Sequence, residues 1–152
     1  MNFHSYADIL FVEISVFSAL LFAYLLYNNI FLYKTSIKDK LSILLMAGLV
    51  ETISDGIWQF VDGAPGASAW NFAAACGSTI SMAVLTSTLT MISLDCFRLQ
   101  FKSRVPYILL YVLPLAAIAV MGLTTPWTEL VFYIGENWVM EYGALYSYAM
   151  MP

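Results

Sequence analysis

The chain has 152 residues, of which 61% are hydrophobic and only 11% are charged, and its formal net charge is −4. Soluble domains average roughly 45–50% apolar and about 25% charged residues, so this composition excludes an ordinary water-soluble fold. Because a membrane-spanning helix needs about 20 residues to cross about 30 Å of hydrocarbon, the length allows four or five such helices in one membrane domain.

Four apolar stretches follow one another along the chain. They cover residues 9–33, 41–60, 70–94 and 105–124. A segment rich in glycine and proline, residues 61–66, separates the second stretch from the third and is typical of a loop. Pro114 lies inside the fourth stretch, where we expect it to kink or loosen the helix. The sequence therefore predicts an all-α integral membrane protein with four transmembrane helices in a single domain, residues 1–152.

The basic residues are confined to two places in the chain. All six lysines and arginines fall in the short connections between the first and second stretches and between the third and fourth. Because cytoplasmic loops of membrane proteins are enriched in lysine and arginine, this pattern places both connections in the cytoplasm. The amino terminus, the loop at 62–69 and everything after Thr124 are then expected outside.

The pattern changes in the outer segment, residues 125–142. Two runs rich in β-prone residues, 130–134 and 138–142, flank a short segment that begins with Gly135. Such an arrangement predicts a β-hairpin at the outer membrane surface, where tryptophan and tyrosine are favoured. The last residues, 143–152, are apolar but too few to cross a bilayer, so they are interpreted as an incomplete fifth helix.

Acidic residues within the apolar stretches are the main candidates for function. Glu51 and Asp55 are four residues apart, so they share one face of a helix. Trp58 and Asp62 continue that face toward the outside. A carboxylate at mid-membrane costs at least about 2.5–3.5 kcal/mol, so Glu51 must be protonated, hydrated or bound to a cation. With Glu13 of the first stretch, these residues are candidates for an outward-facing ligand-binding or proton-responsive pocket.

A structural alternative accounts for the same acids without a ligand. Glu51 would be protonated and would hydrogen-bond a serine or threonine of a neighbouring helix, while Asp55 and Glu13 would reach interfacial water. For Glu51 the two interpretations are equally favoured. For Glu13 the alternative is preferred, because its side chain needs to climb only about one helical turn to reach water.

The third stretch is rich in small and hydroxylated residues, which favours close helix packing over a polar permeation path. Near its inner end, Asp95 is three residues from Arg98 and is expected to pair with it. Cys76 and Cys96 are 20 residues apart on one predicted helix, about 30 Å, so they cannot form a disulfide.

Several functional classes are not supported by any motif. The chain has one histidine and two separated cysteines, which do not give a metal-ligand spacing, and we expect no metal and no cofactor. Phosphate-binding and nucleophile-elbow motifs are absent from the sequence, so we expect no enzyme within this chain. Three basic residues per short loop suit lipid phosphates better than nucleic acid.

Several local patterns resemble the amino-terminal seven-helix sensor region of bacterial GGDEF-domain diguanylate cyclases and related sensor histidine kinases. These patterns are Asp55–Trp58, Leu123–Trp127, Phe132–Ile134, Glu136-Asn137 and Tyr142–Tyr146. The resemblance implies a bacterial plasma-membrane protein in which a hairpin after the fourth span leads into the fifth. It also implies a cytoplasmic output domain after the seventh span, so the chain would be a truncated sensor region. The resemblance also implies a basic residue where this sequence has Glu141 and Tyr142, and this departure argues against a ligand site on the hairpin.

From the resemblance and the acidic residues we expect a membrane-embedded signal-input module. Its partners would be the lipid bilayer, a small extracellular ligand or ion and, optionally, a second copy of the chain. A small-solute transporter, or its membrane-embedded binding subunit, is the alternative, since buried acids and a hydroxyl-rich helix also suit a substrate path. A third class is a membrane assembly partner without a ligand.

Overall fold

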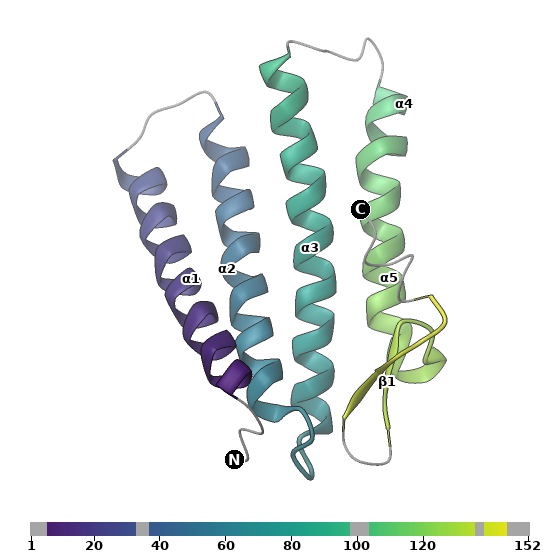
Figure 1. The fold of residues 1–152 in the computed structure, drawn as a ribbon. Coiled ribbons are helices and arrows are strands. Elements are labelled where there is room, and N and C mark those ends of the chain that lie inside the picture. The colour runs from purple at the N-terminus through teal and green to yellow at the C-terminus, as the bar shows by residue number, and fades with distance from the viewer. Residues whose placement is uncertain (1–5, 33–36, 98–103, 136–138, 146–152) are drawn as a thin grey trace.

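The computed structural model describes residues 6–32, 37–97, 104–135 and 139–145, and its helices stand side by side in a row (Figure 1). Each helix packs mainly against its neighbour in the row. The elements are α1 (Tyr6–Phe31), α2 (Lys38–Val61), α3 (Ser68–Cys96), α4 (Arg104–Tyr107), η1 (Ile108–Val112), α5 (Leu113–Thr128), β1 (Phe132–Ile134) and β2 (Met140–Tyr142).

Three of these helices, α1, α2 and α3, are long and apolar enough to cross a membrane. The expectation of a helical membrane protein is therefore confirmed at that level. The fourth column consists of α4, η1 and α5, and α5 alone is a shorter apolar helix of 16 residues. Apolar side chains cover the outside of the row, as on α1, where Phe17 is 70% exposed, so lipid or further protein must cover it.

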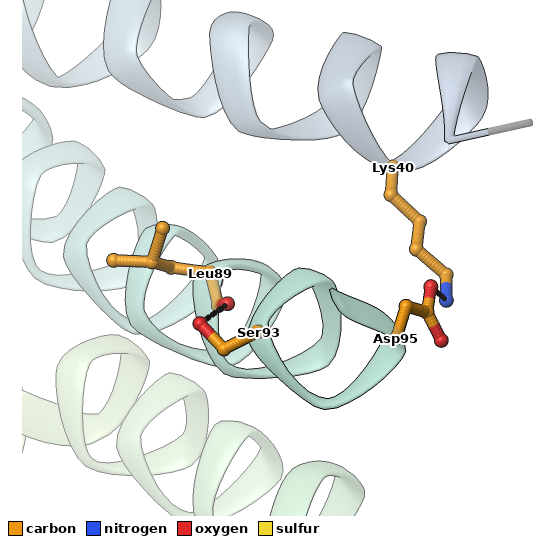
Figure 2. A network of polar contacts seen from close by, with 4 residues as sticks. All are labelled: Lys40, Leu89, Ser93 and Asp95. Carbon is orange, nitrogen blue, oxygen red and sulfur yellow. Dashed lines mark hydrogen bonds and ion pairs between the residues drawn. The ribbon is translucent and has the colours of Figure 1, made fainter. Parts of the chain in front are cut away.

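The interior of the row is lined by small side chains of α3, which lies between α2 and α5. A Cβ atom on Gly77 would meet the side chain of Ser54 on α2, so these two helices approach closely. The hydroxyl of the buried Thr79 donates to the carbonyl of Ala75 within its own helix at 2.8 Å. Near the other end of α3, the exposed hydroxyl of Ser93 donates to the carbonyl of Leu89 in the same way at 2.9 Å (Figure 2). These features favour the close-packing interpretation of the third stretch.

Prolines shape the fourth column as the sequence predicts. Pro114 follows the wide π-helical turn η1 by two residues. Proline has no N–H and its ring clashes with the carbonyl four residues earlier, which here belongs to Leu110, so the widened turn relieves that clash. The expected loosening at Pro114 is therefore observed.

The end of α5 differs from the prediction, because residues 125–128, assigned to the outer segment, continue the helix. Pro126 lies within this last turn and leaves the carbonyl of Gly122 without its usual N–H donor. The thiol of Cys76 on α3 donates to that carbonyl at 3.2 Å, which compensates for the missing bond. Glu129 then adopts a left-handed conformation, with φ of 53°, and ends the helix.

The predicted hairpin is confirmed as an antiparallel pair of short strands, with Phe132 opposite Tyr142 and Ile134 opposite Met140. Residues 136–138, which include the predicted turn residues, lie outside the described part. In Figure 1 the hairpin lies at the same end of the row as the α2–α3 loop. Residues 143–145 are non-helical, and 146–152 are outside the described residues, so a fifth helix stays a prediction.

The hairpin is packed on the helices by a small apolar core. Val131 is completely buried and Phe132 is 2% exposed, and they belong to one hydrophobic cluster with Ala75 and Cys76 of α3. The ring of Phe132 lies 5.3 Å from that of Phe72, measured between ring centroids, in a tilted arrangement. The hairpin is therefore an integral part of the fold at this end of the row.

Candidate functional site

A cavity of about 250 Å³ lies between α2, α3 and the hairpin. Three of the four candidate residues chosen from the sequence, Glu51, Asp55 and Trp58, line it from α2. The helical spacing predicted that they share one face, and the structure turns that face toward α3. The remaining lining residues are Ala74, Ala75, Ser78, Thr79, Met82, Phe132 and Met140.

Glu51 is only half satisfied within this cavity. The hydroxyl of Ser78 on α3 donates to Oε1 at 2.8 Å. The other oxygen, Oε2, is buried and has no hydrogen-bond partner in the described part of the chain. The structural alternative requires a serine or threonine partner on a neighbouring helix, and Ser78 is such a partner. The binding interpretation requires an unpaired polar atom in a cavity, and Oε2 is such an atom.

Trp58 carries a second unsatisfied polar group in the same lining. Its indole Nε1 is buried without an acceptor among the described residues. Buried polar atoms are nearly always hydrogen-bonded to protein or to ordered water, because leaving one unpaired costs about 1–3 kcal/mol. An acceptor at Glu51 and a donor at Trp58 in one cavity therefore indicate that a polar molecule, either water or a ligand, occupies it.

Glu13 is not brought to this cavity. It lies on α1, its side chain is exposed, and it is absent from the lining residues. The expectation that three acids line one pocket is therefore met only for Glu51 and Asp55. The interfacial interpretation of Glu13, which the sequence preferred, fits its exposed position, because an exposed carboxylate near the end of a helix reaches water.

Asp62 has a structural role that the sequence pattern did not reveal. Its Oδ1 accepts a hydrogen bond from the side-chain amide of Asn71 at 3.0 Å and another from the backbone N–H of Met140 at 2.9 Å. One carboxylate oxygen thus links the end of α2, the first turn of α3 and strand β2. Because Met140 also lines the cavity, Asp62 fixes the hairpin where it forms a wall of the site.

Sequence reasoning missed the cavity walls supplied by other elements. Ser78 was one of several hydroxyl residues on the third stretch, and periodicity alone did not select it as the partner of Glu51. Phe132 and Met140 join the site only because the hairpin folds back onto α3, a contact between residues far apart in the chain. The sequence predicted the hairpin itself but not its packing against α3.

The hairpin has its own polar contact on the side away from the core. The hydroxyl of Tyr133 donates to Oε2 of Glu141 at 2.6 Å across the two strands. This hydrogen bond, together with the negative charge of Glu141, raises the pKa of Tyr133 above its usual value of 10. Both residues lie outside the long apolar helices.

A second cavity, of about 390 Å³, lies between α3, α5 and β1. It is lined by residues of α3, α5 and β1, with Glu129 as its acidic side chain. Within the described chain, none of its lining residues carries a buried polar atom without a partner. The cavity at Glu51 is therefore the better candidate site, although it is smaller.

The opposite end of the row carries the described basic residues, Lys38, Lys40 and Arg104. Lys40, in the first turn of α2, forms an ion pair with Asp95 near the end of α3 (Figure 2). The expected partner of Asp95 was Arg98, which lies outside the described residues. Lys40 was missed because it is 55 positions away in sequence and meets Asp95 only through the antiparallel packing of α2 and α3.

Comparisons with protein-family models, with curated proteins and with solved structures find no match to this chain. The likeness to sensor regions of diguanylate cyclases and histidine kinases consequently rests on the residue patterns alone. The functional argument must come from the cavity and from the distribution of charge.

Proposed function

We propose that the chain is a membrane-embedded signal-input module whose sensing pocket is the cavity lined by Glu51, Asp55 and Trp58. The observation that carries this proposal is the pair of unsatisfied polar atoms, Glu51 Oε2 and Trp58 Nε1, in a cavity of about 250 Å³. A pocket with a few polar groups in an apolar lining is the usual form of a small-molecule site. The hairpin supplies part of the wall, so occupancy can be transmitted to the segment that follows.

The proposed topology has four spans with the amino terminus outside. The column from Arg104 to Thr128 supports a fourth span, because its 25 residues, at roughly 1.5 Å each, exceed the hydrocarbon thickness of about 30 Å. Clustering of all six basic residues in two connections supports a cytoplasmic location for that end. The cavity and the hairpin would then face the exterior.

An open row of helices supports a role within a larger assembly. α1 packs against α2 but exposes most of its apolar side chains, and the same face would be covered by further helices or by a second copy of the chain. The proposed assembly is the seven-helix sensor region of a bacterial plasma-membrane protein with a cytoplasmic GGDEF or histidine-kinase domain. We assign no catalytic step to residues 1–152.

The natural reading frame downstream of the codon for Pro152 tests this proposal. We expect it to continue through three further apolar spans into a cytoplasmic GGDEF or kinase domain. A stop codon directly after Pro152, together with uptake of a solute by liposomes containing the chain, would overturn the sensor function in favour of a transporter. The buried carboxyl of Glu51 is the observation that keeps the transporter as the second candidate.

A further inference from the structure

The cavity at Glu51 is lined by carboxyl groups, and no basic residue of the described chain lines it with them. Its lining contains two carboxyl side chains, Glu51 and Asp55, and no lysine, arginine or histidine. The six basic residues lie at sequence positions 34–40 and 98–104. Those in the described part of the chain, Lys38, Lys40 and Arg104, stand in the first turns of α2 and α4, at the other end of the row (Figure 1). Attraction between an occupant's positive charge and these carboxylates would be only weakly screened in such a partly buried site.

The unpaired oxygen of Glu51 indicates which polar group the ligand carries. Ser78 satisfies only Oε1 of Glu51, and the buried Oε2 still requires a donor. An ammonium group has three N–H donors and a positive charge, so it completes the hydrogen bonds of Glu51 and neutralises the carboxylate in one contact. A neutral hydroxyl would donate to Oε2 but would leave the charge uncompensated.

The apolar residues of the lining indicate that the rest of the ligand is organic. Ala74, Met82, Phe132 and Met140 present carbon and sulfur atoms to the cavity. Calcium, for example, requires six or more oxygen ligands. Among the described residues, no group of three acidic, histidine or cysteine side chains is placed to hold a metal ion, so a divalent metal does not suit the cavity. Alkyl groups suit this lining, and the Trp58 ring favours a neighbouring cation. An ammonium group has donors but no acceptor, so the buried Nε1 of Trp58 would pair with a water molecule beside the occupant.

We infer that the cavity between α2, α3 and the hairpin binds a small organic ammonium ion, with its N–H donors at Glu51 and its alkyl part against Met82, Phe132 and Met140. This inference rests on the proposed function, because it names the ligand class of the same pocket. At the packing density of protein interiors, a cavity of about 250 Å³ holds roughly five to ten non-hydrogen atoms.

Three probes with five non-hydrogen atoms each separate the contributions of charge, donors and apolar volume. n-Butylammonium has all three, n-butanol lacks the charge, and tetramethylammonium lacks the N–H donors. Isothermal titration of the chain in nanodiscs of zwitterionic lipid measures binding of each. We expect n-butylammonium to bind at least about tenfold more tightly than either of the others, since hydrogen bonds to charged groups contribute about 1.5–3 kcal/mol.

Two matched variants test the location of the site. Glu51→Gln keeps an acceptor for Ser78 but removes the charge, and we expect n-butylammonium binding to weaken at least about tenfold. Glu13→Gln makes the same chemical change on the exposed face of α1 and should leave binding unchanged. If Glu51→Gln does not fold, as judged by circular dichroism and gel filtration, Asp55→Asn replaces it as the test.

Each remaining outcome is decisive. The ammonium inference would be overturned if n-butanol or tetramethylammonium bound as tightly as n-butylammonium, because the N–H donors or the charge would then contribute nothing. It would also be overturned if Glu51→Gln weakened binding no more than Glu13→Gln does, because the probe would then be bound elsewhere or partitioned into the membrane. Absence of binding by all three probes would also overturn it. The proposed sensor function would survive any of these results if the reading frame continues into an output domain, so the two failures are distinguishable.

Discussion

The two ends of the helical row satisfy their acidic residues in different ways. At the end with the basic connections, Asp95 pairs with the cation of Lys40 (Figure 2). At the hairpin end, the contacts of Asp62, Glu141 and Glu51 come from amide, phenol and serine donors that carry no charge. In the Lys40–Asp95 pair each charge meets an opposite charge, whereas the hairpin end retains carboxyl groups that an added cation can still neutralise.

This difference indicates at which end of the row a bound ligand would contribute more free energy. An exposed ion pair contributes little to stability, with a typical value of 0–1 kcal/mol, because water already solvates both partners. Hydrogen bonds to a partly buried carboxylate contribute more, and an unfilled acceptor in a cavity favours any occupant that completes it. The contacts of the hairpin end should therefore contribute more to stability than the ion pair does, and this end is also the one where a ligand can bind.

Removing the Asp62 carboxylate is expected to have the largest effect. Asp62→Ala leaves the Asn71 amide and the Met140 N–H without their shared acceptor, and we expect a loss of about 2–4 kcal/mol in unfolding free energy. Asp62→Asn retains an acceptor oxygen and should lose less than half as much. Denaturant unfolding in detergent micelles, followed by circular dichroism, measures both; equal losses would show that charge alone matters.

A Cβ atom at Gly143 tests the packing of the hairpin directly. In Gly143→Ala the new methyl group would meet the backbone carbonyl oxygens of Glu129 and Leu130, which cannot rotate away as a side chain can. We expect a destabilisation of about 1–3 kcal/mol. The control is Gly66→Ser, also at the hairpin end: a Cβ there meets no atom within 4 Å, although its φ of +80° adds some strain.

The outcome for Gly143 is read from proteolysis as well as from stability. A released hairpin should expose the segment near Glu141 to a glutamate-specific protease, while the α1–α3 helices stay protected. If Gly143→Ala is as stable and as resistant as the parent, the close approach to Glu129 and Leu130 does not constrain the hairpin, and the contrast between the two ends is weakened.

The helices and the hairpin were within reach of sequence reasoning, because each depends on a local pattern: runs of apolar residues for α1 to α3, and two β-prone runs for β1 and β2. The face shared by Glu51, Asp55 and Trp58 follows from helical spacing in the same way. Two long-range contacts could not be predicted: the hydrogen bond between Asp62 and Met140 and the ion pair between Lys40 and Asp95. Tertiary packing, and not any local period of the sequence, decides which elements become neighbours.

The ion pair at the opposite end should tolerate substitution well. For Lys40→Met we expect a loss of at most about 1 kcal/mol, because both side chains of the pair are partly exposed, at 32% for Lys40 and 42% for Asp95. Restoring the pair in reverse, with Lys40→Glu and Asp95→Lys together, should recover stability if the contact is electrostatic. A loss as large as that of Asp62→Ala would remove the distinction between the two ends.

The smallest expected effect concerns the tyrosine of the hairpin at alkaline pH. Glu141 accepts the Tyr133 hydroxyl proton in a hydrogen bond and repels a phenolate, so folding raises the pKa of Tyr133 above 10. A group whose pKa is raised by folding contributes stability that is complete below its unfolded pKa and is lost as pH rises through the folded value. The hairpin should therefore weaken only above about pH 10.

Absorbance titration at 295 nm, which follows phenolate formation, measures this in the parent and in Tyr133→Phe. The difference between the two curves is the titration of Tyr133, and its midpoint should lie above 10, the value for an unperturbed tyrosine. In Glu141→Gln, which removes the negative charge, the midpoint should fall back toward 10. A Tyr133 midpoint at or below 10 in the parent would mean that the phenol and the carboxylate do not meet across the strands. The hairpin end would then lose one of the uncharged-donor contacts that set it apart from the end carrying Lys40 and Asp95.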